Sequence, residues 1–220
     1  MQRAVDVVAD RLQPRDNAQW PLLEASLRDA LAQELGGSIE KRLAINGWSK
    51  TLGGVDVYVP NGGPDRAGIG CETKISTIHE AFYDLLKLAA LCQQGSLTTG
   101  FAVVAAKTHE WQAEMARGGA ISQLSDLDRS PGTWSTIVLI THEGARWRQL
   151  ISRTSVKPAW VPTRLATVAV PPTEMTAIPN HQIRIVGVRH ASDERLDFDT
   201  RGTIVAPEWP VGADLSGSAP

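Results

Sequence analysis

The sequence predicts an α/β fold with a mixed central sheet that is flanked by helices. The apolar residues follow helical and strand-like spacings in the order helix, strand, strand, helix, strand, helix, strand. The first two strands are separated by a short loop rich in turn residues, which predicts an antiparallel hairpin. Later strands are continuous apolar runs, which are typical of strands buried on both faces of a sheet.

The composition is that of an ordinary folded protein. The chain has 220 residues, of which 42% are hydrophobic and 21% charged, and its net charge is −2. No stretch reaches the roughly 18 to 20 apolar residues of a membrane span, and charges interrupt the start of the chain where a signal peptide would be apolar. We therefore expect a cytoplasmic protein without a membrane partner. Cys71 and Cys92 are expected to be packing residues.

A helix is the first predicted element, and it begins near Pro21 and ends at Gly36. Its leucines recur at helical spacing: Leu23, Leu27, Leu31 and Leu35. Glu24 and Glu34 project within the same arc as these leucines, so both acids are expected to lean toward the interior.

After a linking segment (residues 38–51), Gly54–Pro60 and Gly68–Ser76 alternate like half-buried strands. A second helix is expected from Thr77 to Gln94, capped by Thr77 with Glu80 three residues later and ended by Gly95. Its many leucines and alanines predict a place in the core.

The rest of the chain predicts a buried strand at residues 100–106, a polar helix at 108–124, a buried strand at 135–141, and two weaker strands at 165–170 and 182–189. We expect one core domain over 1–143, a basic, β-rich extension packed on that core over 144–206, and a disordered tail over 207–220.

Strand alternation gives the hairpin one apolar and one ionisable face. Val55, Val57 and Val59 share one side, while Asp56, Glu72 and Lys74 lie on the other. If the loop closes symmetrically, Asp56 lies opposite Glu72 with the two Cβ atoms about 5 Å apart, where like charges repel. A divalent cation would relieve this repulsion, and magnesium is usually held by one or two carboxylates plus water and phosphate.

These residues carry a family resemblance. Asp56 followed by Glu72-Thr73-Lys74 on a hairpin, between a helix with an inward acid and a helix with a buried strand, resembles the PD-(D/E)xK nuclease superfamily, whose fold is restriction endonuclease-like. The resemblance spans residues 20–107, and Val55 stands where the motif has proline.

The resemblance implies that Asp56, Glu72 and Glu24 are metal ligands for Mg²⁺ or Mn²⁺, with Glu34 as the reserve for Glu24. It implies that Lys74 orients the attacking water and stabilises phosphate charge. The expected activity is phosphodiester hydrolysis in nucleic acid, with DNA favoured over RNA and an endonuclease over an exonuclease. The sequence leaves open whether the protein forms a homodimer.

Several alternatives stay open on the residues alone. The hairpin charges are also compatible with an ordinary surface salt bridge between Lys74 and either acid, and with a non-catalytic nucleic-acid-binding or scaffold protein of the same fold. The basic segment after residue 143 is a candidate phosphate-binding surface through Arg146, Arg148, Arg153 and Lys157. Within this segment, Trp147 and Trp160 fit base stacking and core packing equally well. Nucleotide-cofactor motifs are absent from the sequence.

Overall fold

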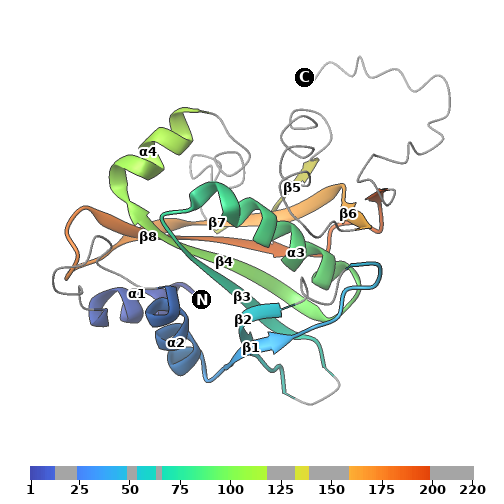
Figure 1. The fold of residues 1–220 in the computed structure, drawn as a ribbon, viewed down its shortest axis with the longest axis horizontal. Coiled ribbons are helices and arrows are strands. Elements are labelled where there is room, and N and C mark those ends of the chain that lie inside the picture. Colours follow the sequence, from blue (N-terminus) through green and yellow to red (C-terminus); the bar gives the residue numbers. More distant parts are fainter. Residues whose placement is uncertain (13–23, 49–53, 63–65, 118–131, 139–158, 199–220) are drawn as a thin grey trace.

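The computed structural model describes residues 1–12, 24–48, 54–62, 66–117, 132–138 and 159–198. Within these ranges, seven strands form one sheet in the order β1-β2-β3-β4-β8-β7-β5, and four α-helices flank it (Figure 1). The predicted α/β class with a mixed sheet is confirmed. The strands of this sheet are β1 Ser38–Arg42, β2 Gly54–Val59, β3 Gly68–Ile75, β4 Leu97–Lys107, β5 Ser135–Val138, β7 Arg164–Glu174 and β8 His181–Arg189.

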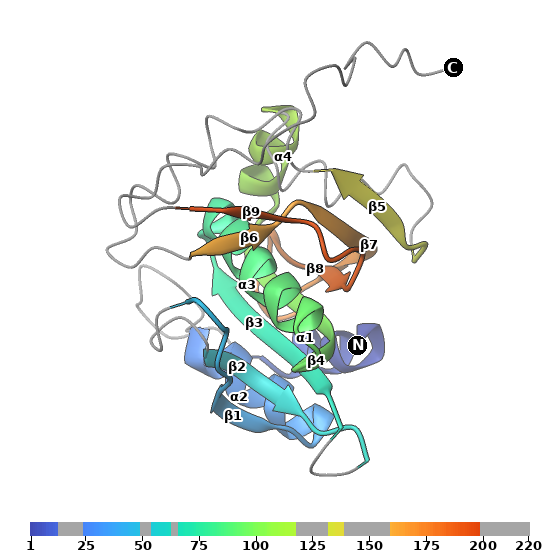
Figure 2. The same cartoon turned by 90° about the vertical axis from the view of Figure 1, so that its right-hand side faces the viewer.

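The sheet is mixed because of a single parallel pair among the described strands, β3 with β4. Parallel neighbours need a crossover connection, and here it contains the helix α3 (Ala81–Gln93), preceded by a 3-10 turn at Ile78–Glu80. Strands β7 and β8 come late in the sequence but lie inside the sheet, between β4 and β5. Figure 2 shows a separate pair, β6 (Trp160–Pro162) with β9 (Arg195–Asp197), next to α3.

Helices cover both faces of the sheet. The helices α1 (Gln2–Arg11) and α2 (Glu24–Leu35) pack with β4 residues Val103 and Ala105, whereas Ala102 and Val104 of the same strand pack in the cluster around α3. Alternate side chains of β4 thus face opposite helical layers, which is why its sequence is a continuous apolar run. The fourth helix, α4, runs from Thr108 to Ala116.

Several local predictions are confirmed. The hairpin strands occupy the expected ranges, and Gly36 (φ 64°) and Gly95 (φ 78°) end their helices in the left-handed conformation that favours glycine. Cys71 and Cys92 are buried free thiols. In the described part of the chain, no helix is long and apolar enough to cross a membrane.

Other local predictions are wrong. The segment expected to be a linker contains β1, whose residues are all exposed at the sheet edge and therefore carry no apolar alternation. The predicted cap at Thr77 is not formed, because the chain enters α3 through the 3-10 turn and no side-chain cap bond is made. The strand at 135–141 was expected to be buried, but β5 is an edge strand with Ser135 and Thr136 exposed.

Some predictions lie outside the described residues. These are the helix beyond Arg117, the strand beyond Val138, the proposed domain boundary at 143/144 and the tail from 207 onward. They stay predictions.

Candidate functional site

The β2–β3 pairing fixes the position of Asp56. The pairs Val57–Cys71, Tyr58–Gly70 and Val59–Ile69 confirm the predicted register. Backbone pairing between β2 and β3 stops at Val57. Beyond it, the Asp56 side chain bonds to β3: its Oδ2 accepts hydrogen bonds from the Thr73 backbone N–H at 2.7 Å and the Thr73 hydroxyl at 2.9 Å. Asp56 is therefore tied to β3 one residue beyond Glu72.

The end of this pairing also separates two valines that were expected to share a face. Val57 packs in the cluster beneath α1 and α2, whereas Val55 packs in the cluster around α3. Strand alternation holds only while β2 stays paired with β3, and it is lost at Asp56.

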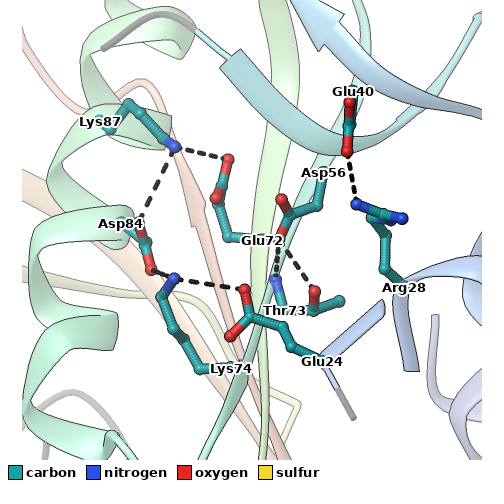
Figure 3. A network of polar contacts seen from close by, with 9 residues as sticks. All are labelled: Glu24, Arg28, Glu40, Asp56, Glu72, Thr73, Lys74, Asp84 and Lys87. Atoms are coloured by element: carbon teal, nitrogen blue, oxygen red, sulfur yellow. Dashed lines mark hydrogen bonds and ion pairs between the residues drawn. The ribbon is translucent and has the colours of Figure 1, made fainter. Parts of the chain in front are cut away.

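Charged side chains from three elements form an alternating chain beside this hairpin (Figure 3). Lys87 Nζ lies 2.7 Å from Glu72 Oε1 and 3.8 Å from Asp84 Oδ1. Lys74 Nζ lies 3.5 Å from Asp84 Oδ2 and 3.7 Å from Glu24 Oε1. The order from β3 to α2 is thus Glu72, Lys87, Asp84, Lys74, Glu24, with each anion next to a cation.

The sheet register explains why α3 contributes to this chain of charges. Glu72 pairs with Ala102 and Lys74 with Val104, and both β4 residues face α3. Asp84 and Lys87 are three residues apart, so they project from the same side of α3. The polar face of the hairpin is therefore covered by α3 at Glu72, which is buried, whereas Asp56 and Lys74 are half-buried.

Burial and charge set the pKa values of the acids. Burial raises the pKa of Glu72 to about 8, against the attraction of Lys87 and with the repulsion of Asp84 and Asp56 adding to it. Burial likewise raises the pKa of Asp84, and the two lysines oppose that rise. Partial burial raises the pKa of the more exposed Glu24. For Lys74, burial acts to lower the pKa, but the surrounding carboxylates outweigh it and raise the pKa.

The two helix acids have different surroundings, and neither is interior as expected. Glu24 and Glu34 are both exposed, because they lie near opposite ends of α2 where a charged group reaches solvent or a partner. Glu24 contacts Lys74, whereas Glu34 pairs with Arg11 of α1 at 3.2 Å. Only Glu24 of the two belongs to the chain of charges. Lys74 pairs with neither Asp56 nor Glu72 within ion-pair distance among the described contacts.

Sequence reasoning missed Thr73, Asp84 and Lys87. A signal for the last two existed: they interrupt a run of leucines and alanines in a helix that was expected to be core. A buried acid and a buried base three residues apart in such a helix indicate charged partners on a neighbouring element.

Outside the hairpin, the candidate phosphate-binding residues Arg146, Arg148, Arg153 and Lys157 lie outside the described residues, as does Trp147. Trp160 is buried in the α3 cluster, where its indole N–H donates to the Asn46 carbonyl at 2.7 Å. For Trp160 the core alternative is therefore correct.

The carboxylate oxygens of this site are chemically suitable ligands for a hard divalent cation. All the acids are carboxylates, the ligand type that Mg²⁺ and Mn²⁺ prefer, and Mg²⁺ needs only one or two of them. Among the described residues, no group of three or more His, Cys, Asp or Glu side chains lies in a position to hold a metal ion. The expected metal ligands Asp56, Glu72 and Glu24 therefore do not form such a group. Each carboxylate instead contacts a residue of the protein: Asp56 contacts Thr73, Glu72 contacts Lys87, and Glu24 contacts Lys74.

The comparisons with known proteins add no relative: no protein-family model, no curated protein and no solved structure matches the chain.

Proposed function

We propose that the protein is a metal-dependent nuclease with a restriction endonuclease-like core, which hydrolyses phosphodiesters, DNA rather than RNA, with Mg²⁺ or Mn²⁺. One observation carries the proposal. Asp56, Glu72, Lys74 and Glu24 gather beside one hairpin: Asp56 is hydrogen-bonded to Thr73, between Glu72 and Lys74 on β3, and Glu24 of α2 lies 3.7 Å from Lys74 (Figure 3). A hairpin acid pair, a lysine two residues after the second acid, and an upstream helix acid are the residues that the PD-(D/E)xK resemblance requires.

The proposed roles follow from position and charge. Glu72 holds the cation together with a second carboxylate, since Mg²⁺ needs one or two, and the resemblance names Asp56 for that place. Lys74 orients the attacking water and stabilises charge on the phosphate, and Glu24 holds the Lys74 ammonium in place from α2. The bound cation would lower the pKa of the water and neutralise charge on the scissile phosphate.

The experiment is a cleavage assay on a mixed pool of linear and circular DNA and of RNA, with and without MgCl₂ or MnCl₂. We expect divalent-ion-dependent cleavage of DNA, including the circular DNA, because an endonuclease needs no end. Asp56→Ala and Lys74→Ala should each reduce the rate by at least about 100-fold, the size typical of a lost catalytic group. Circular dichroism and thermal unfolding check that these variants remain folded.

The two acids of α2 supply a matched control. Glu24→Gln should reduce the rate, whereas Glu34→Gln removes the same charge from the same helix but only breaks the pair with Arg11, and should leave the rate unchanged. Equal effects of the two substitutions would speak against a role for Glu24. No cleavage of any substrate by the folded wild-type chain with either metal would overturn the proposed function.

A second candidate is a non-catalytic nucleic-acid-binding or scaffold module with the same fold. It is favoured by the pairing within the site, since Glu72, Asp84 and Glu24 each have a lysine partner and Asp56 has Thr73. Such a network neutralises its own acids without a cation. Binding of DNA or RNA in a gel-shift assay, unchanged by EDTA and without cleavage, would favour this candidate.

A further inference from the structure

Two carboxylates from different elements share one ammonium group at the centre of the site. Lys87 of α3 lies within ion-pair distance of both Glu72 of β3 and Asp84 of α3. All three residues are nearly inaccessible, with exposed fractions of 4% for Glu72, 6% for Asp84 and 9% for Lys87. Lys87 thus bridges two acids that water barely reaches, and Lys74 adds a second ammonium group 3.5 Å from Asp84 Oδ2.

These carboxylates are incompletely satisfied. Glu72 Oε1 and Asp84 Oδ2 are buried and, within the described part of the chain, neither has a hydrogen-bond donor at acceptable angles. Their nearest partners are the lysine ammonium groups, with Lys87 Nζ 2.7 Å from Glu72 Oε1 and Lys74 Nζ 3.5 Å from Asp84 Oδ2. Asp56 differs, because its Oδ2 already accepts two hydrogen bonds from Thr73.

We propose that Glu72 and Asp84 are the pair of carboxylates that bind the divalent cation, and that the Lys87 ammonium holds the same position in its absence. The cation and the Lys87 charge then compete for the same two acids. Asp84 becomes a metal ligand that the hairpin motif does not contain, and Lys87 becomes a positioning residue that keeps the acids together when no cation is bound. The inference rests on the proposed function for the kind of cation, but its test needs no cleavage.

If the cation and Lys87 compete, removing the Lys87 charge should strengthen cation binding while it destabilises the metal-free protein. Lys87→Met keeps the length of the side chain but removes the charge, so the two buried acids lose their compensation and the variant should be less stable than the wild type without metal. Mg²⁺ or Mn²⁺ should restore that stability. With its competitor removed, the cation should bind about tenfold more tightly or better, which corresponds to about 1.4 kcal/mol.

The measurements are isothermal titration of the full-length protein with MnCl₂ and MgCl₂ at pH 8.5, and thermal unfolding with and without each ion. Lys74→Met is the matched control, because Lys74 contacts Asp84 but lies outside ion-pair distance of Glu72, and it should raise the affinity less than Lys87→Met does. Asp84→Asn, which leaves Lys87 in place, should weaken binding of the ion, and so should Glu72→Gln.

The outcomes separate this inference from the proposed function. Tighter binding in Lys87→Met and weaker binding in Asp84→Asn support the shared site even if no nucleic acid is cleaved, a result that would count against the nuclease alone. Unchanged or weaker binding in Lys87→Met overturns the competition. If Lys87→Met does not fold with or without metal, unchanged affinity in Asp84→Asn overturns the site.

Discussion

At the level of single residues, Asp56 serves the backbone of β3 as well as the candidate site. β2 stops pairing at Val57, so the Thr73 N–H has no carbonyl partner from β2 and instead donates to the Asp56 carboxylate. A buried N–H without a partner is costly, and Thr73 is fully buried. Asp56 thus stabilises the fold in addition to its proposed catalytic role, so its substitution is expected to lower both the stability and the activity.

The Thr73 hydroxyl allows this structural part to be measured. Thr73→Val keeps the shape of the side chain but removes one of the two hydrogen bonds to Asp56. We expect a loss of about 1 to 3 kcal/mol in the free energy of unfolding, because the lost bond is made to a charged acceptor. Urea denaturation measures it, and in an Asp56→Ala background the same substitution should cost less. Equal costs in both backgrounds would mean that the hydroxyl does not act through Asp56.

Glu72 predicts how stability depends on pH. Its pKa is raised from 4.5 to about 8 in the folded protein, so between these values the folded state holds a proton that the unfolded state has released. The folded state then binds more protons, and the free energy of unfolding falls as pH rises through this range. The stabilisation is complete below about pH 4.5 and lost above about pH 8.

Glu72→Gln should remove this contribution, because glutamine resembles the protonated acid at every pH. We expect the wild type to lose on the order of a few kcal/mol relative to Glu72→Gln between pH 5 and pH 8. Urea unfolding at several pH values in EDTA measures the difference, with Glu34→Gln as the exposed control. A difference that stays constant with pH, or that changes in the opposite direction, would contradict the raised pKa.

At the level of elements, the close approach of α3 to β4 puts Asp84 and Lys87 in reach of β3. Gly100 of β4 makes this approach possible: a Cβ there would lie 2.5 Å from the Cβ of Leu88, the residue next to Lys87. The contact is with the rigid base of a side chain, so one of the two elements would have to move. The helix position, and with it the Lys87–Glu72 pair, depends on a small residue in β4.

Gly100→Ala should therefore destabilise the fold by about 1 to 3 kcal/mol, the usual cost of overpacking. The matched control is Gly54→Ala in β2, where an added Cβ meets nothing within 4 Å and the effect should be small. Chemical denaturation of both variants gives the comparison. Similar stabilities of the two variants would mean that α3 does not pack on β4 at this distance.

At the level of the whole molecule, the mixed sheet brings together residues that are far apart in sequence. The connection from β3 to the parallel β4 carries α3 over the hairpin face, and β8 and β7 extend the same sheet on the other side of β4. Residues after position 158 therefore complete the sheet that holds the candidate site. The restriction endonuclease-like character of this core remains part of the proposed function.

The sequence by itself determined the α/β class, the two hairpin strands with their register, and the two helices that end at Gly36 and Gly95. These features depend on local signals: the period of the apolar residues and the conformational freedom of glycine. Strand β1 was not predicted, because all its side chains are exposed and its sequence therefore has no apolar period.

Only the tertiary structure decided which charges meet. It paired Glu72 with Lys87, left Glu34 with Arg11, and tied Asp56 to Thr73, and none of these pairs follows from the spacing of residues along one element. The physical reason is that an ion pair depends on distances of a few ångströms between elements. Those distances are set by how α3 crosses the sheet and where β2 stops pairing.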